Sequence, residues 1–334
     1  MAYVVTGAGG HLGNRVVQRL IGMGCEVRAL VFSRRDREAL AGMDCEMRQA
    51  DVLYTAQTED AIRPGDTVIH CAGMVSITAR DKRVYNVNVL GTKNVIEACR
   101  RKCAAKLVYV SSVHAIPEKP KGQVITETAE FAPGLVRGYY AKTKAEATAA
   151  VLAAKDVPVT VVHPSGIIGP YDSGRGHITQ LITDYINGRL PACVRGGYDF
   201  ADVRDVAAGV CQAALRGKDR ECYILSGAYS TIENLLALLH EMYPDTKKLK
   251  CLPVWLAKAA APFFELSGKI AGRTPLYTSY SLYTLSSNSA FSNAKAVQEL
   301  GYVTRPLRDT LFDTVEWLKE VGRCRISAPV HGCV

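Results

Sequence analysis

Short apolar runs rich in β-branched residues alternate with helix-periodic segments through the first half of the chain. The apolar runs predict strands, and the segments with apolar residues every three or four positions predict helices. Strands that are apolar throughout are typical of a parallel sheet covered by helices on both faces, so we expect an α/β fold with a doubly wound parallel sheet. The expected strands are Tyr3–Thr6, Glu26–Phe32, Glu46–Ala50, Thr67–Cys71, Leu107–Ser111 and Val159–His163, and the expected helices are Leu12–Ile21, Val84–Lys102 and Tyr140–Ala154.

The pattern changes after Pro170, where Gly and Pro cluster at 169–176 and again at 188–197. We therefore expect a sheet domain over 1–170, a smaller and mostly helical cap over 171–321 that is interleaved with late elements of the sheet domain, and a loosely ordered tail over 322–334. The helices expected in the second half are Asp202–Arg216, Thr231–Tyr243, Leu252–Gly272 and Leu307–Val321.

Composition narrows the class of protein. Of the 334 residues, 48% are hydrophobic and 22% are charged, which is ordinary for a globular protein. The formal net charge is +9, but the basic residues are dispersed and no run of five occurs, so we expect no nucleic-acid partner. No apolar run approaches the ~18 residues of a membrane span. The segment 252–272 has two interpretations: a helix that covers a substrate pocket, which we favour, or one that makes weak contact with a membrane surface.

The eleven cysteines are spread from Cys25 to Cys333 and form no pair of CxxC units. The first expected strand starts at Tyr3, which leaves no room for a secretory signal. We therefore expect reduced thiols, a cytoplasmic location and no metal site.

A glycine-rich turn joins the first expected strand to the first expected helix. It carries Gly7, Gly10 and Gly13, with His11 and Leu12 before the last of them. Glycine permits a tight turn and lets backbone N–H groups approach a pyrophosphate, and the last glycine lets helix and strand pack closely. The N-terminus of the helix then faces the anion with its positive dipole end. Because the motif follows a strand and opens a helix, it indicates a dinucleotide site rather than a plain turn.

Two later strand ends support a dinucleotide. Asp51-Val52 follows the third strand, where a carboxylate can accept a hydrogen bond from an adenine amino group. Cys71-Ala72-Gly73 follows the fourth strand, at the carboxyl edge where such folds bind ligands. Each pair or triplet alone also fits an ordinary turn.

The end of the second strand bears on the choice of cofactor. NAD-binding folds usually place an acid there to hold the ribose hydroxyls. Here Ser33, Arg34 and Arg35 follow the strand instead, and arginine suits a 2′-phosphate. We therefore favour NADP(H) over NAD(H), although the two arginines also fit the solvated start of a helix.

A tyrosine and a lysine four residues apart are candidates for proton transfer. Tyr140 and Lys144 share one face of an expected helix, and a nearby ammonium lowers the pKa of a phenol toward neutrality. A second Tyr-x-x-x-Lys set, at Tyr243 and Lys247, contains a proline and lies far from the expected strand ends. Ser112, just after the fifth strand, would place a hydroxyl beside a substrate carbonyl, although serines at strand ends often only cap or turn.

Taken together, these residues resemble the extended branch of the short-chain dehydrogenase/reductase superfamily, over roughly residues 2 to 320. The order and spacing of the motifs carry the resemblance more than any one of them. The matching segments are the glycine turn, Asp51, Cys71-Ala72-Gly73, Asn88-Val89-Leu90-Gly91-Thr92, Ser112, Tyr140, Lys144, His163-Pro164-Ser165-Gly166-Ile167-Ile168-Gly169-Pro170 and Asp202-Val203-Arg204-Asp205-Val206-Ala207.

The resemblance implies a Rossmann fold, a nicotinamide cofactor and roles for individual residues. By the family pattern Tyr140 is the general acid/base, Lys144 holds the ribose hydroxyls, and Ser112 polarises the substrate carbonyl, with Ser111 as the alternative. Asn88 resembles the residue that steadies this group. Further residues expected along the nicotinamide ribose or amide are Pro164, Ser165 and Gly166. The helices Val84–Lys102 and Tyr140–Ala154 resemble the faces through which this superfamily forms homodimers.

The C-terminal half resembles the 3β-hydroxysteroid dehydrogenase and dihydroflavonol reductase side of the superfamily. The segment after Ser112 lacks the Asp-Glu pair of the sugar-nucleotide dehydratases. The resemblance implies an NAD(P)-dependent enzyme that interconverts a ketone and a secondary alcohol on a bulky apolar substrate. One alternative is a nucleotide-sugar epimerase that holds NAD tightly. The other is a non-catalytic dinucleotide sensor, but the complete Ser-Tyr-Lys set argues against a sensor.

Overall fold

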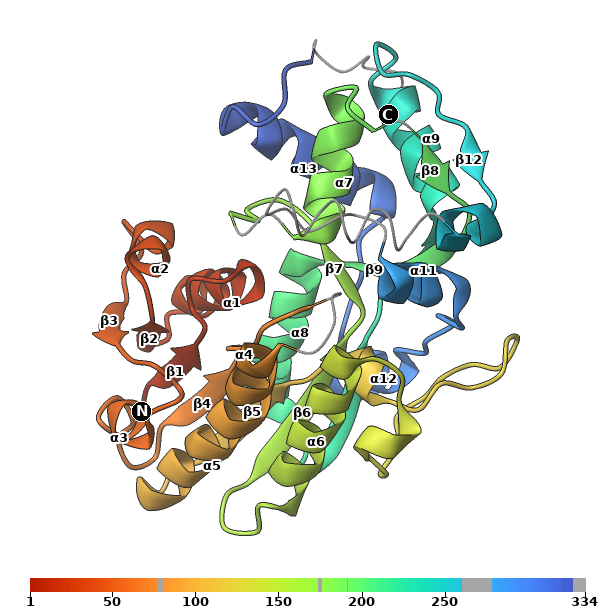
Figure 1. Ribbon diagram of the computed structural model, residues 1–334. Coiled ribbons are helices and arrows are strands. Elements are labelled where there is room, and N and C mark those ends of the chain that lie inside the picture. The colour runs from red at the N-terminus through yellow and green to blue at the C-terminus, as the bar shows by residue number, and fades with distance from the viewer. Residues whose placement is uncertain (77–80, 174–175, 191, 260–277, 327–334) are drawn as a thin grey trace.

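A seven-stranded parallel sheet forms the centre of the molecule (Figure 1). The computed structural model describes residues 1–76, 81–173, 176–190, 192–259 and 278–326. The strand order is β10-β6-β5-β4-β1-β2-β3, so the chain leaves the centre in one direction through β2 and β3 and in the other through β4, β5 and β6. The strands are β1 (Tyr3–Thr6), β2 (Val27–Val31), β3 (Glu46–Gln49), β4 (Thr67–His70), β5 (Lys106–Val110), β6 (Val159–Pro164) and β10 (Glu221–Leu225).

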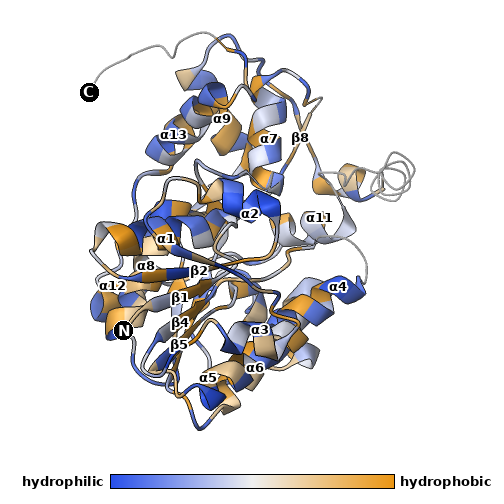
Figure 2. Ribbon diagram, turned by 90° about the vertical axis from the view of Figure 1, so that its left-hand side faces the viewer, coloured by the Kyte–Doolittle hydropathy of each residue, from blue (hydrophilic) through white to orange (hydrophobic). Residues whose placement is uncertain are grey.

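Helices cover both faces of this sheet, as Figure 2 shows in a view along its layers. On one face α1 (His11–Gly22) packs against α8 (Val203–Arg216), and on the other α5 (Thr92–Arg101) packs against α6 (Tyr139–Ala153). Most strand residues are buried because helices lie on both sides, which explains their continuous apolar runs. The expected doubly wound Rossmann sheet is confirmed. The shorter elements are α2 (Arg34–Ala39), α3 (Thr55–Glu59), α4 (Lys82–Tyr85), α12 (Ala294–Leu300), the π-helical Asn86–Gly91 and the 3-10 turns Val113–Ala115 and Pro133–Leu135.

The remaining elements lie beyond the carboxyl ends of the sheet strands (Figure 1). A three-stranded sheet has the order β11-β9-β7, and a short ribbon pairs β8 with β12. The division at residues 170 and 171 remains a prediction. These elements are β7 (Gly166–Ile168), β8 (Cys193–Val194), β9 (Gly197–Asp202), β11 (Ala228–Thr231), β12 (Cys251–Leu252), α7 (His177–Ile186), α9 (Ile232–Met242), α11 (Ser279–Ser286) and α13 (Leu307–Glu320).

Two expectations for the second half are wrong in part. Leu252 is the end of a strand, and the helical stretch begins at Val254 and runs through 259, where the described residues stop. The first residues of the tail are packed, because Cys324 is buried and Arg323 donates a hydrogen bond to the Asp172 carbonyl oxygen (2.9 Å). The rest of the predicted tail, 327–334, and the rest of the predicted helix to Gly272 lie outside the described residues.

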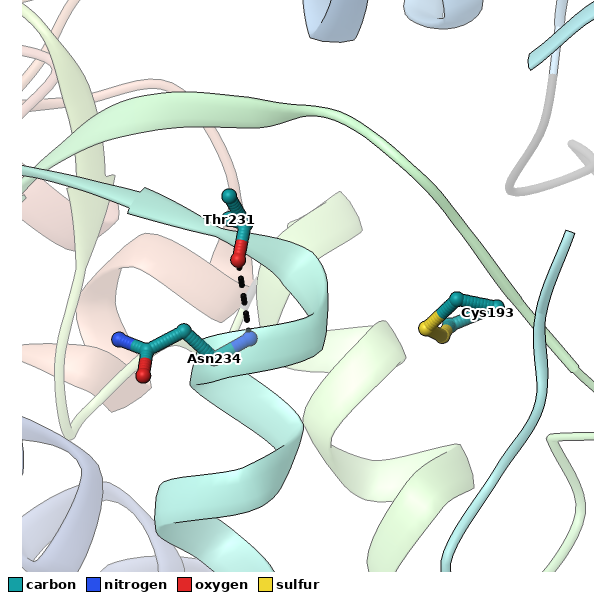
Figure 3. The surroundings of a disulfide bond; sticks show 4 residues. Cys193, Thr231 and Asn234 are labelled. Carbon is teal, nitrogen blue, oxygen red and sulfur yellow. Dashed lines mark hydrogen bonds between the residues drawn. A yellow bond between two sulfur atoms is a disulfide. The ribbon is translucent and has the colours of Figure 1, made fainter. Parts of the chain in front are cut away.

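The expectation that all thiols are reduced is also wrong. Cys193 and Cys251 form a disulfide, with Cα atoms 4.6 Å apart, where β8 pairs with β12 (Figure 3). The two cysteines are 58 residues apart in the sequence, and only the pairing of the two short strands brings them together. Within the described part of the chain, no helix is long and apolar enough to span a bilayer.

Candidate active site

A cavity of about 670 Å³ lies where the sheet strands end and the second half of the chain covers them. Its floor includes the glycine turn after β1 and the ends of β4, β5 and β6. Its roof includes residues of α7, β9 and α11. The strand order reverses between β1 and β4, and in open α/β sheets ligands bind at such a point.

The glycine turn is built so that only glycine fits at two positions. Gly7 has φ +64°, and a Cβ there would lie 2.7 Å from the backbone of Ala72. A Cβ on Gly13 would lie 2.1 Å from the Gly7 carbonyl oxygen. The next helix, α1, begins at His11 with no side-chain cap and no acidic residue in its first turn. Its first N–H groups are therefore available to an anion in the cavity, and this part of the chain fits a pyrophosphate.

Most of the other expected cofactor residues lie on this cavity. Leu12, Cys71, Gly73, Pro164, Ser165 and Gly166 line it together with Gly7, Gly10, His11 and Gly13. Ala72 lies behind the turn, against Gly7. His11 is held by a hydrogen bond between its Nε2 and the Pro170 carbonyl oxygen (2.9 Å), and burial lowers the pKa of its imidazole.

Four residues expected at the adenosine end do not line the cavity. Asp51 accepts a hydrogen bond from the backbone N–H of Leu53 (2.9 Å), and Val52 is buried. Arg34 pairs with Glu38 at 2.8 Å on the surface of α2, and Arg35 is exposed beside it. The structure therefore does not bring these four side chains into the described cavity.

An acid that the sequence analysis overlooked lies next to the glycine turn. Asp36 caps α2 by accepting hydrogen bonds from the backbone N–H groups of Phe32 (3.0 Å) and Ser33 (2.8 Å). A Cβ on Gly9 would lie 2.4 Å from the Asp36 Cβ, so the carboxylate sits over the turn. The signal in the sequence that points to Asp36 is its capping position, three residues after Ser33.

Ser112, Tyr140 and Lys144 meet at the centre of the cavity. All three are buried and line it. Tyr140 and Lys144 lie one turn apart on α6, and the Ser112 hydroxyl lies close enough to the Tyr140 phenol to lower its pKa. Lys144 Nζ donates to the Val110 carbonyl oxygen at the end of β5 (2.9 Å). Ser111 lines the cavity too, but its Oγ hydrogen-bonds to Thr148 Oγ1 (2.7 Å) on α6, so Ser112 is the better match to the expected role.

The electrostatics of this group differ from the expectation. We expected Lys144 to lower the pKa of Tyr140, yet burial raises it to about 12, and the opposing influence is the hydrogen bond with Ser112. Burial also lowers the pKa of the Lys144 amine to about 8. The reason is that burial removes water from both groups, and Lys144 Nζ donates to the Val110 carbonyl oxygen (2.9 Å) and the Tyr109 hydroxyl (3.4 Å) rather than to Tyr140.

Asn88 lies behind the site and does not line the cavity. It is buried in the π-helical segment, where its Nδ2 donates to Thr143 Oγ1 (3.1 Å) and to the Met74 carbonyl oxygen (3.0 Å). Its Oδ1 accepts from the backbone N–H of Met74 (2.8 Å). Asn88 thus ties α6 to the loop after β4, which matches a steadying role.

The sequence analysis missed an aromatic group beside Tyr140. His114 stacks on Tyr198 with ring centroids 5.6 Å apart, and its Nε2 hydrogen-bonds to the Tyr198 hydroxyl (3.0 Å). The rings of Tyr140 and Tyr280 each lie 6.1 Å from His114. Burial lowers the pKa of His114 to about 4, so it is neutral at pH 7. Its position two residues after Ser112 was a usable signal, whereas Tyr198 and Tyr280 reach the site only through tertiary folding.

The chain is similar to known proteins in sequence and in structure. The profile of the NAD dependent epimerase/dehydratase family matches residues 3–225. The chain is similar to sterol demethylase protein B of Methylococcus capsulatus, with 31% identity over 96% of this chain and 99% of that protein. It is also similar to a putative dihydroflavonol 4-reductase of Synechocystis, with 29% identity over 96% of this chain and 95% of that protein. The crystal structure of gox2253 matches with a TM-score of 0.85 and 30% identity, over 97% of this chain and 99% of that one.

Proposed function

This chain belongs to the NAD dependent epimerase/dehydratase family, within the extended short-chain dehydrogenases/reductases, and from that premise we propose that it interconverts a ketone and a secondary alcohol on a bulky apolar substrate. The observation that carries the proposal is one cavity that joins the glycine turn, the Ser112–Tyr140–Lys144 group and an apolar roof. The roof residues Ile178, Leu181, Phe200, Ile232 and Leu285 suit a hydrocarbon framework better than a sugar.

Different residues of the chain bind different parts of the cofactor. The N–H groups at the start of α1 bind the pyrophosphate of a nicotinamide dinucleotide, and the glycines let it approach the backbone. Lys144 of α6, whose Nζ lies at the end of β5, would hold the ribose hydroxyls. When bound, the cofactor supplies the hydride acceptor or donor of the reaction. Pro164, Ser165 and Gly166 line the cavity, and we assign them to its nicotinamide end.

Tyr140 is the general acid and base of the proposed reaction. Its phenol, kept protonated by burial, donates a proton to the carbonyl oxygen during reduction and takes one back during oxidation. The hydroxyl of Ser112 hydrogen-bonds the same oxygen and orients it toward Tyr140. The neutral His114 and the aromatic rings around it exclude water from this end of the cavity.

We further propose NADP(H) as the preferred cofactor. Arg34 and Arg35 are exposed at the start of α2, beside the turn that Asp36 covers. We expect their side chains to reorient toward a bound 2′-phosphate, for which arginine is well suited. Arg34→Ala with Arg35→Ala should raise the Kd for NADPH at least tenfold and leave the Kd for NADH within twofold, measured by nicotinamide fluorescence. Arg37→Ala, an exposed arginine of the same helix, is the control. Equal loss of both cofactors would contradict the proposal.

The activity itself is tested with the purified chain, NADPH or NADH, and a panel of apolar ketones that includes steroids and flavonoids. We expect oxidation of the nicotinamide, followed by its absorbance. Ser112→Ala should lower kcat about a hundredfold. Ser111→Ala should leave kcat nearly unchanged and lower the free energy of unfolding, because it removes the hydrogen bond to Thr148. Absence of turnover across the whole panel would refute the assigned reaction.

A nucleotide-sugar epimerase is the second candidate, because the matching family includes epimerases. An epimerase returns the hydride to the same substrate and therefore keeps its cofactor. Mass spectrometry of the purified, denatured protein should find no retained NAD if the ketone proposal holds.

A homodimer through α5 and α6 stays a prediction.

A further inference from the structure

An exposed apolar surface follows the strand β12. Leu252, Trp255 and Leu256 expose 40%, 68% and 40% of their surfaces within five consecutive positions. Other large exposed apolar side chains, such as Val303, are separated along the chain. A tryptophan that is two-thirds exposed between two exposed leucines calls for an explanation beyond ordinary surface composition.

The segment is anchored by its opposite face. Val254 and Ala257 pack against Val194 of β8 and Leu282 of α11, and Ala257 is buried. Pro253 precedes the helical turn, and its carbonyl oxygen accepts from the N–H groups of Leu256 (3.1 Å) and Ala257 (3.3 Å). With that inner face fixed, Trp255 and Leu256 are held outward, so their exposure is a property of the fold.

Basic residues precede and follow these apolar residues along the chain. Lys247, Lys248, Lys250 and Lys258 are all exposed, and Asp245 is the one acid between residues 245 and 258. Arg195, also exposed, lies beside Leu252, because its backbone N–H donates to the Leu252 carbonyl oxygen (2.9 Å). Basic side chains around exposed tryptophan and leucine are the pattern of segments that lie in the interface of an anionic bilayer.

We propose that this surface, defined as Arg195, Lys247, Lys248, Lys250, Leu252, Trp255, Leu256 and Lys258, docks the protein onto an anionic lipid bilayer. The apolar side chains enter the boundary between headgroups and acyl chains, and the cations bind the lipid phosphates. The surface lies one helix away from the cavity, since Leu282 of α11 packs against the inner face of the same segment, and Ser281, Thr284 and Leu285 of α11 line the cavity. Docking would therefore bring the cavity close to a medium that dissolves apolar compounds.

The test uses the full chain, without cofactor or substrate, so that it is independent of the proposed reaction. The chain has two tryptophans, and Trp317→Phe leaves Trp255 as the single reporter. Vesicles of phosphatidylcholine with one-quarter phosphatidylglycerol should shift its emission to the blue and carry the protein in a flotation assay. Vesicles of phosphatidylcholine alone, or 0.5 M salt, should weaken binding about tenfold or more.

Variants assign the binding to this surface. Trp255→Ser with Leu256→Ser should lower the partition coefficient at least tenfold in flotation, and Val303→Ser, which removes another exposed apolar side chain, should leave it unchanged. Lys247→Gln with Lys248→Gln should lower it for anionic vesicles only. The proposal is overturned if no vesicle binds the protein or if the serine pair binds as well as the parent. It is also overturned if emission shifts with protein concentration in the absence of lipid, because a second copy then covers the surface.

Discussion

Lys144→Met should stabilise the protein while it removes the group that we assign to the ribose hydroxyls. Lys144 is buried, and burial lowers the pKa of its amine from 10.5 to about 8. The difference corresponds to about 3 kcal/mol, which is the cost of keeping the charged form buried at neutral pH. Methionine fills the same space without a charge, but the substitution leaves the Val110 carbonyl oxygen without its donor, at about 1 kcal/mol.

The expected net effect at pH 7 is a gain of about 2 kcal/mol in the free energy of unfolding, or a rise in Tm on the order of 3 °C. The pH dependence follows from the direction of the pKa change. Below pH 8 both folded and unfolded chains carry the proton and the cost is fully present. Between pH 8 and 10.5 the folded protein loses the proton first, so the cost fades and the advantage of the variant disappears.

The assay is denaturant unfolding of parent and variant without cofactor at pH 7 and pH 10, with kcat measured in parallel. Lys142→Met, an exposed lysine on the same helix, controls for the change of residue type and should alter stability little. If Lys144→Met is no more stable than the parent at pH 7, or if its advantage is the same at pH 10, the reasoning from burial is wrong.

Two further variants test the turn and the disulfide. Gly13→Ala places a Cβ 2.1 Å from the Gly7 carbonyl oxygen and should lower the free energy of unfolding by about 2 kcal/mol and abolish NADPH binding. Gly22→Ala, with open space around it, should change neither. If a fluorescence titration shows that Gly13→Ala binds NADPH normally, the glycine turn is not the binding site. Cys193→Ser with Cys251→Ser opens a loop of 58 residues and should lower the free energy of unfolding by up to about 4 kcal/mol. The Tm of the parent should fall when reductant is added, and the Tm of the variant should not. A variant with the Tm of the parent would show that the disulfide does not constrain the protein.

Most of the sheet was predictable because strands such as β1, β4 and β6 are buried on both faces and leave continuous apolar runs in the sequence. The edge strand β10 was not among the expected strands. The expected strand Tyr3–Thr6 agrees with β1 at both ends. The glycine turn and the Tyr140–Lys144 pair were predictable because each is encoded within a few residues. Tyr198 and Tyr280 were not, because β9 and α11 reach the site only after the chain folds over the sheet.

The same distinction explains the errors. The Cys193–Cys251 bond depends on a two-residue pairing across 58 positions, which no local pattern signals. The pKa of Tyr140 depends on how deeply the phenol is buried, and helix spacing alone indicated only that Lys144 would be near it. A sequence motif thus specified which residues meet, and the packing around them determined their protonation.

The central claim is that Tyr140 transfers the proton, and replacement of its hydroxyl tests it most directly. Tyr140→Phe should lower kcat for an apolar ketone at least a thousandfold, with the Kd for NADPH within about threefold of the parent, because the ring and its packing remain. Tyr139→Phe, the neighbouring tyrosine on α6, is the matched control and should keep most of the activity. A Tyr140→Phe variant that reduces the ketone at close to the parent rate would contradict the account.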